Sequence, residues 1–215
     1  MRVLAVLLSA IAAYPWIGYP ALVAAIARWR PRTPRVASFE LEPPHVVVLC
    51  VAHDEEQVIG AQVEGVLAQD YSADRLRFLL VTDACTDATE ARYLEAARSE
   101  PDRFAVLSLT ERGGKASGIA VAWPQLAAEI VVLTDANVVL GPRTVSALVA
   151  PFADPLVAAV AGAKRIVRSD EGGVHEESEG LYWRLEHWLK RNESASGISV
   201  VADGGCWALR RTAWD

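Results

Sequence analysis

The stretch Ile130-Val131-Val132-Leu133-Thr134-Asp135-Ala136-Asn137 decides the fold of this chain. Its first four residues are valine, isoleucine or leucine with no polar alternation, which is typical of a strand buried on both faces of a parallel sheet. Ligands of open α/β sheets bind beyond the carboxyl ends of the strands, so Asp135 and Asn137 are predicted to be within reach of a ligand. Their oxygens suit a divalent cation or sugar hydroxyls, although both residue types are also common in turns.

Length and charge limit the class of protein. The 215 residues suffice for one well-cored α/β domain with a small appendage. Residues 1–39 contain five arginines and no acid, so the rest of the chain holds 16 basic and 27 acidic residues, a net charge of −11. This acidic balance argues against a nucleic-acid partner. The cysteines, Cys50, Cys85 and Cys206, lack metal-binding spacing, so no zinc site is predicted.

The N-terminal residues read as a membrane anchor. Residues 3–27 carry no charge and are long enough to cross a bilayer as a helix, which Pro15 and Pro20 are predicted to kink. Four arginines follow within residues 28–35, against Arg2 alone before the segment, so the positive-inside rule places the C-terminal side in the cytoplasm. A cleaved signal peptide would need a shorter apolar core, and a retained anchor is favoured. We therefore expect a single-pass transmembrane anchor in the inner or plasma membrane over residues 1–30, a Pro-rich linker over 31–44 and a cytoplasmic domain over 45–215.

Strand and helix patterns alternate through that domain, which predicts a doubly wound α/β sheet. Buried strands are predicted at residues 45–52, 76–82, 104–109, 130–134 and 157–166. Helices are predicted at about 55–69, 88–98 and 115–122. A further helix over 176–193 carries Leu185 and Trp188 in an apolar stripe, which we interpret as core packing rather than a sugar-binding platform. Strand-like sequence returns at 197–209.

Polar residues follow the predicted strands. Asp54 and Asp87 each precede a Gln or Glu by three residues, so helix capping is favoured over ligand binding for both. Asp83 has no capping partner and is predicted to accept hydrogen bonds from a ligand. Gly113-Gly114-Lys115 allows close approach of the backbone and adds a positive charge at a helix start. That segment is a plausible phosphate site, although its spacing is not that of a Walker loop.

Five segments in this order resemble the inverting family 2 glycosyltransferases with the GT-A fold, and specifically their membrane-anchored branch related to cellulose, chitin and poly-N-acetylglucosamine synthases. The resemblance covers roughly residues 45–211. The matching segments are Ala52-His53-Asp54-Glu55-Glu56, Thr82-Asp83-Ala84-Cys85-Thr86-Asp87, Gly113-Gly114-Lys115-Ala116, Thr134-Asp135-Ala136-Asn137 and Gly204-Gly205-Cys206-Trp207-Ala208-Leu209-Arg210-Arg211.

The resemblance implies a fold and a nucleotide-sugar ligand. The fold would be a GT-A domain, which is a Rossmann-like, doubly wound and mostly parallel sheet, preceded here by one transmembrane helix. Asp83 matches the carboxylate that reads the uracil N3–H of a UDP-sugar. Ala52, His53 and Glu55 would flank the same base, and Lys115 would lie near the diphosphate.

The resemblance also implies a divalent metal, Mg²⁺ or Mn²⁺. Asp135 and Asn137 match the Asp-x-Asp element that meets the ribose and the metal. Asn137 stands where the family has its second Asp, and its single usable oxygen is expected to weaken metal binding. The family's general base, an Asp in an acidic pair, should follow the Ala-Leu-Arg-Arg segment. The chain stops at Asp215, so we expect the donor-binding half of a longer enzyme, with Asp203 and Asp215 as the remaining candidates for the base.

The expected activity is inverting transfer of a hexose or N-acetylhexosamine to a polysaccharide or lipid-linked acceptor at the membrane. Two alternatives stay open. One is a non-catalytic subunit that binds a nucleotide sugar or assists assembly, and the other is a nucleotidyl enzyme acting on a nucleoside triphosphate. The heavy use of Ala, and of Arg over Lys, is typical of a GC-rich bacterial source.

Overall fold

The computed structural model describes residues 2–32, 42–163, 175–197 and 205–214, with residues 175–179 and 181–183 described by their backbone alone. The chain forms two compact units. One consists of residues 1–33 with 165–201, and the other of residues 34–164 with 202–215. The expected ends of the anchor at residue 30 and of the linker at residue 44 remain a prediction. Asp203 and Asp215 lie outside the described residues.

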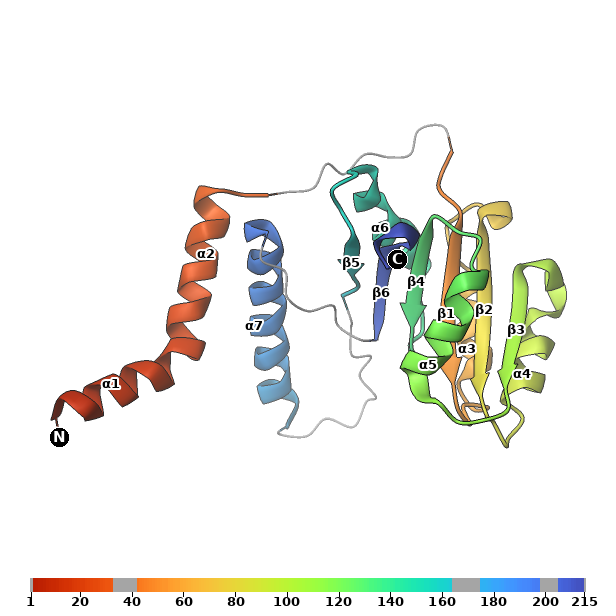
Figure 1. Ribbon diagram of the computed structural model, residues 1–215, viewed down its shortest axis with the longest axis horizontal. Coiled ribbons are helices and arrows are strands. Elements are labelled where there is room, and N and C mark those ends of the chain that lie inside the picture. Colours follow the sequence, from red (N-terminus) through yellow and green to blue (C-terminus); the bar gives the residue numbers. More distant parts are fainter. Residues whose placement is uncertain (1, 33–41, 164–174, 198–204, 215) are drawn as a thin grey trace. The chain divides into compact units, whose positions relative to one another are not determined.

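The second unit is built on a six-stranded sheet of order β3-β2-β1-β4-β6-β5. Strands β1 to β4 are parallel, whereas β6 runs antiparallel to both of its neighbours, β4 and β5. The arrowheads of β1 to β4 therefore point to one edge of the sheet (Figure 1). The strands are β1 (Val46–Ala52), β2 (Leu76–Asp83), β3 (Phe104–Leu109), β4 (Ile130–Thr134), β5 (Ala159–Ala161) and β6 (Cys206–Arg210).

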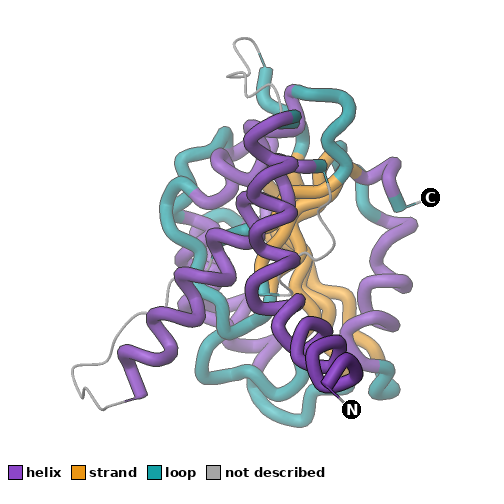
Figure 2. Tube along the Cα trace, turned by 90° about the vertical axis from the view of Figure 1, so that its left-hand side faces the viewer, coloured by secondary structure: helices purple, strands orange, loops and turns teal. Residues whose placement is uncertain are grey.

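Helices cover both faces of the sheet (Figure 2). Side chains alternate across a strand, so Val48 and Cys50 of β1 join the core under α3, α4 and α6, while Val47 and Leu49 join the core under α5. Both faces of β1 and β4 are thus buried, which is why their sequences are continuous apolar runs. The predicted doubly wound, mostly parallel sheet is confirmed. The helices are α3 (Ile59–Leu67), α4 (Thr89–Ala96), α5 (Gly114–Ala122) and α6 (Thr144–Val149).

Several predicted elements differ from the structure in length, among them the strand expected over 197–209, which is β6 (Cys206–Arg210), and the helix expected over 88–98, which is α4 (Thr89–Ala96). The predicted helix start near Glu55 is wrong, because α3 begins at Ile59 and its N-cap, Val58, makes no side-chain capping bond. The predicted strand over 157–166 is β5, whose ladder with β6 covers Ala159–Ala161. Residues 164–166 of that prediction lie outside the described residues.

The first unit contains a long apolar helical stretch. Helix α1 (Arg2–Ala13) passes through a π-helical turn at Tyr14–Gly18 into α2 (Tyr19–Trp29). Pro15 lies in the π-helical turn, where a proline removes a regular hydrogen bond and disturbs the helix, as expected from the sequence. Within the described residues, Arg2–Trp29 is the one helix long and apolar enough to cross a membrane, by length and composition.

Helix α7 (His175–Ser196) packs along α2 in the same unit. The Tyr19 hydroxyl donates to Glu193 Oε1 at 2.6 Å, and the Arg32 N–H donates to the Ala195 carbonyl at 2.7 Å. Leu185 and Trp188 are 45% and 44% exposed. The interpretation of these two residues as core packing is therefore wrong, because nearly half of each residue's surface is exposed.

Candidate functional site

The polar residues predicted from the sequence gather where β1, β2 and β4 end. Ala52 pairs with Thr82, and Cys50 pairs with Thr134, so these three neighbouring strands end almost level. The next residues along the chain, His53, Asp83 and Asp135, therefore share one edge of the sheet. This edge is the carboxyl end at which open α/β sheets bind ligands.

Asp83 holds the glycine turn after β3 in place. The Gly113 N–H donates to Asp83 Oδ1 at 2.7 Å, and the Gly114 N–H donates to Oδ2 at 2.8 Å. The Gly113 N–H lowers the pKa of the Asp83 carboxyl against the opposing effect of burial, and the Gly114 N–H adds to that lowering. Asp83 is only 3% exposed. Its visible contacts are thus to the start of α5, and base recognition by its remaining acceptor capacity stays a prediction.

Both glycines of this turn are required by its geometry. A Cβ on Gly113 would lie 2.5 Å from Ser117 Oγ, so a larger residue would collide with the first turn of α5. Gly114 has φ +79°, which is the left-handed region that favours glycine. The close approach expected of this glycine backbone is therefore seen here as an approach to the Asp83 carboxylate.

His53 connects β1 to the same group. Its Nδ1 lies 2.7 Å from the Asp83 carbonyl oxygen, which can only accept, so Nδ1 carries the hydrogen. Its Nε2 lies 3.5 Å from Asp54 Oδ2. Ala52 is buried at the end of β1, and the Glu55 N–H donates to Thr89 Oγ1 at 2.8 Å. Of the three residues predicted to flank the nucleotide base, His53 is thus the one that contacts Asp83 directly in the described structure.

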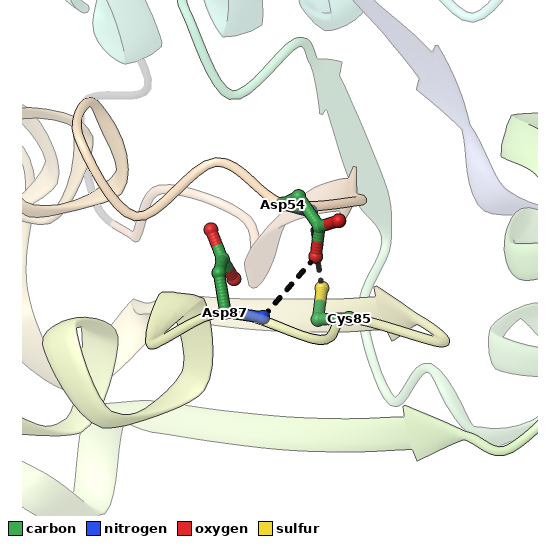
Figure 3. A group of neighbouring side chains, drawn as sticks. All are labelled: Asp54, Cys85 and Asp87. Carbon is green, nitrogen blue, oxygen red and sulfur yellow. Dashed lines mark hydrogen bonds between the residues drawn. The ribbon is translucent and has the colours of Figure 1, made fainter.

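Asp54, Cys85 and Asp87 form a second polar cluster, which joins the loops after β1 and β2 (Figure 3). Asp54 Oδ1 accepts the N–H groups of Thr86 at 2.7 Å and Asp87 at 3.3 Å, and the Thr86 N–H is the main reason that the pKa of the Asp54 carboxyl is low. The capping role expected for Asp54 is therefore wrong, because its carboxylate binds the neighbouring loop instead of α3.

Asp87 Oδ1 accepts the Thr89 N–H at 2.9 Å at the start of α4, but the N-cap of this helix is Ala88, so the capping role expected for Asp87 is displaced by one residue. The reciprocal capping box is absent from these contacts, since Glu90 accepts the Ser108 hydroxyl at 2.8 Å. The ligand atoms of Asp54, Cys85 and Asp87 lie within 4.8 Å of one another. Their carboxylates are engaged with backbone amides, so this cluster is accounted for as a connection between loops.

Asp135 and Asn137 lie in a tight turn after β4. The Val138 N–H donates to the Asp135 carbonyl at 3.1 Å, which closes the turn over residues 135–138. The Asp135 side chain is 39% exposed and forms an ion pair with Lys115 Nζ. Asn137 is exposed. The oxygens of a carboxylate and an amide on one turn are a donor set that fits a hard divalent cation. The ammonium group is bonded to that carboxylate and is not one of the donors.

Two further residues at this turn were not predicted. The side-chain amide of Gln62 donates to the Asp135 carbonyl at 2.6 Å, and the Gly205 carbonyl accepts the Asp135 N–H at 3.1 Å. A glutamine among the apolar residues of α3 was the available signal for the first. Gly205 is in the Gly-Gly segment that carried part of the resemblance. A separate hollow between α3 and α4, lined by Glu56, Gln57, Gly60, Arg92, Glu95 and Ala96, contains none of the predicted site residues.

Comparison with known proteins gives a consistent family. The family model described as "Glycosyltransferase like family 2" matches residues 43–215. An N-acetylglucosaminyltransferase of Rhizobium leguminosarum bv. viciae is 25% identical over 170 residues, which are 79% of this chain and 40% of that protein. A beta-monoglucosyldiacylglycerol synthase of Synechocystis sp. is 30% identical over 171 residues, 78% of this chain and 35% of that protein.

A solved structure agrees with these matches. The mannosyltransferase PcManGT from Pyrobaculum calidifontis, in complex with GDP-Man and Mn²⁺, superposes with a TM-score of 0.73 at 29% identity. The match covers 94% of this chain and 55% of that one. The present chain thus spans 35 to 55% of the length of these three proteins.

Proposed function

The chain belongs to glycosyltransferase family 2, and from this premise we propose that it binds the nucleoside diphosphate of a sugar nucleotide across the ends of β1 to β4. The observation that carries the proposal is the contact between Lys115 and Asp135. It places a basic group, suited to a diphosphate, against a carboxylate suited to a divalent metal, at the edge where α/β sheets bind ligands.

In this proposal Asp135 and Asn137 hold a divalent metal, Mn²⁺ or Mg²⁺. When bound, the metal would supply Lewis-acid stabilisation of the departing nucleoside diphosphate. Lys115 binds the diphosphate by a charge-assisted hydrogen bond. Asp83 fixes the start of α5 by its bonds to Gly113 and Gly114, so that the basic group is presented in a constant position.

The base, the sugar and the acceptor are finer parts of the proposal. We propose that the nucleoside is uridine, that the transferred sugar is a hexose or N-acetylhexosamine, and that the acceptor is a polysaccharide or a lipid-linked molecule. The Rhizobium and Synechocystis relatives are named for transfer of N-acetylglucosamine and for synthesis of a glucosyl lipid, which supports this choice of sugars and acceptors. The Pyrobaculum enzyme carries GDP-Man, so guanosine is the competing base to be tested beside uridine.

We also propose that Arg2–Trp29 anchors the domain in a membrane with the domain on the cytoplasmic side. Every residue described in α1 is exposed, as expected for a segment that lipid surrounds. Arg28 and Arg30 are exposed at its C-terminal end, where positive charge favours the cytoplasmic face. Protease protection of the domain in sealed inside-out vesicles would contradict this orientation, whereas cleavage there would support it.

The test of nucleotide binding compares the full chain with two single-charge variants in the same detergent. Asp135→Asn removes the proposed metal ligand, and Asp102→Asn removes an exposed carboxylate just before β3, at the opposite edge of the sheet. Calorimetric titration with UDP and with GDP is run once with MnCl2 and once with EDTA. We expect Mn²⁺ to tighten binding to the chain, Asp135→Asn to remove about tenfold or more of that gain, and Asp102→Asn to keep it. Absence of binding of either nucleotide to the unaltered chain would refute the proposal.

A further inference from the structure

One side chain in the core of the second unit is polar where the buried face of its helix is otherwise apolar. Ile59, Val63 and Val66 form the buried face of α3 and are at most 1% exposed. Gln62 lies on the same face and is 0% exposed. A buried amide destabilises a core unless its hydrogen bonds are satisfied, and an apolar side chain of similar size would fill the space without this cost.

Two hydrogen bonds of Gln62 are donated to the end of β4 and the turn that follows it. Its Nε2 donates to the Asp135 carbonyl at 2.6 Å and to Thr134 Oγ1 at 3.4 Å. Its Oε1 is buried and has no hydrogen-bond partner among the described residues. The two donated bonds, with a further contact to the buried Cys50 thiol, offset the burial of the NH2 end of this amide and leave its oxygen unsatisfied among those residues.

Gln69, two residues after the end of α3, is an example of a glutamine with a purely structural role. Its Nε2 donates to the carbonyls of Gly65 at 2.7 Å and Gly141 at 2.8 Å, and its Oε1 accepts the Val145 N–H at 2.9 Å. Both ends of Gln69 are satisfied, and none of its partners belongs to the predicted site. Gln62, by contrast, is half satisfied and is bonded to the predicted metal turn.

The Asp135 carbonyl that Gln62 binds is the first group of that turn. The same oxygen accepts the Val138 N–H at 3.1 Å, and the Asp135 N–H donates to the Gly205 carbonyl at 3.1 Å. The peptide groups on both sides of the Asp135 Cα are thus fixed, one by α3 and one by the residue before β6. Because Asp135 and Asn137 are residues one and three of the turn, fixing its first carbonyl holds the backbone from which both side chains project.

We propose that Gln62 is a positioning residue for the metal ligands Asp135 and Asn137. This inference rests on the proposed function, because it assumes that the turn over residues 135–138 holds a divalent cation. Gln62 acts through the Asp135 carbonyl and touches neither metal nor substrate. Residues that orient metal ligands from behind generally change metal affinity by about 10–100-fold when they are replaced.

The experiment uses the full chain and the variant Gln62→Met, which keeps the length and volume of the side chain and removes its donor. Binding of UDP and GDP is titrated with increasing MnCl2, and separately in EDTA. We expect the Mn²⁺ concentration for half-maximal enhancement of nucleotide binding to rise about tenfold, with the affinity in EDTA unchanged. Amide exchange at Val138 should also become faster, since the turn loses one of its two fixed ends.

The matched control is Val63→Ala, which removes buried volume on the same face of α3 beside Gln62. It should lower thermal stability and leave the Mn²⁺ dependence unchanged. If Gln62→Met does not fold, Thr134→Val replaces it, because the Thr134 hydroxyl contacts the Asp135 and Gly205 carbonyls at 3.3 and 3.4 Å, and the same rise in Mn²⁺ requirement is expected at smaller amplitude. If the unaltered chain binds nucleotide and a folded variant requires the same Mn²⁺ concentration as that chain, the inference is overturned. A chain that binds neither nucleotide overturns the proposed function instead.

Discussion

Replacing Lys115 by methionine should change two affinities in opposite directions. Lys115 Nζ is bonded to Asp135 Oδ1, and the two side chains are 40% and 39% exposed. An ion pair so accessible to solvent contributes about 0–1 kcal/mol to stability, so Lys115→Met should lower the free energy of unfolding by no more than about 1 kcal/mol. A folded protein is therefore available for binding measurements.

The same pair sets the size of the two effects. Mn²⁺ must displace the ammonium group to reach Asp135 Oδ1, so removing Lys115 should tighten the binding of Mn²⁺ alone by up to about fivefold, the equivalent of about 1 kcal/mol. A diphosphate loses a charge-assisted hydrogen bond worth about 1.5–3 kcal/mol, so UDP or GDP in saturating Mn²⁺ should bind about 10–150-fold more weakly.

Isothermal titration with MnCl2 alone, and then with each nucleotide at saturating MnCl2, measures both effects. The control is Arg92→Met, which removes an exposed cation from an ion pair with Glu95 on α4 and should alter neither affinity. Weaker binding of Mn²⁺ alone to Lys115→Met would show that Lys115 does not compete for Asp135. Unchanged nucleotide affinity would show that Lys115 does not bind the diphosphate.

Two further outcomes concern stability. A Cβ on Gly118 of α5 would lie 2.7 Å from a methyl of Val51, whereas a Cβ on Gly60 of α3 meets nothing within 4 Å. Both substitutions gain up to about 1 kcal/mol of helix propensity, and overpacking costs Gly118→Ala about 1–3 kcal/mol. The melting temperature of Gly118→Ala should therefore lie about 2–12 °C below that of Gly60→Ala. Equal melting temperatures would contradict the close packing of α5 on β1. The pKa values of Asp54 and Asp83 are lowered by backbone N–H groups, so their contribution to the free energy of unfolding is complete above about pH 4 and is lost as the pH falls through their folded-state values. Urea titrations from pH 7 to pH 3 should show this fall, and a smaller one in Asp54→Asn; a constant free energy would contradict it.

The fold was predictable because its information is local. A buried parallel strand must be apolar on both faces, and the uninterrupted runs at β1 and β4 satisfy that requirement by themselves. The predicted third strand coincides with β3, and the helix expected after Lys115 ends at Ala122 as predicted. Family membership was also accessible, since the order of five short segments along the chain carries it.

The contacts of the acidic residues were less predictable. Asp54 has the sequence context of a helix cap, and yet its carboxylate bonds to Thr86, 32 residues later. Leu185 and Trp188 have helical core spacing, and yet both are about half exposed. In each case the local pattern is compatible with the expected role, and only the folded arrangement shows that the side chain is placed elsewhere.

The sequence by itself determined the strands, their order of appearance, the apolar N-terminal helix and the family. The tertiary structure alone decided that Asp83 holds the glycine turn, that Lys115 pairs with Asp135 and that Gln62 supports the Asp135 carbonyl. The physical reason is that backbone preference and burial act on each residue where it stands. Hydrogen bonds at the ends of parallel strands join residues 20 to 73 positions apart, and only the assembled sheet brings those groups within reach.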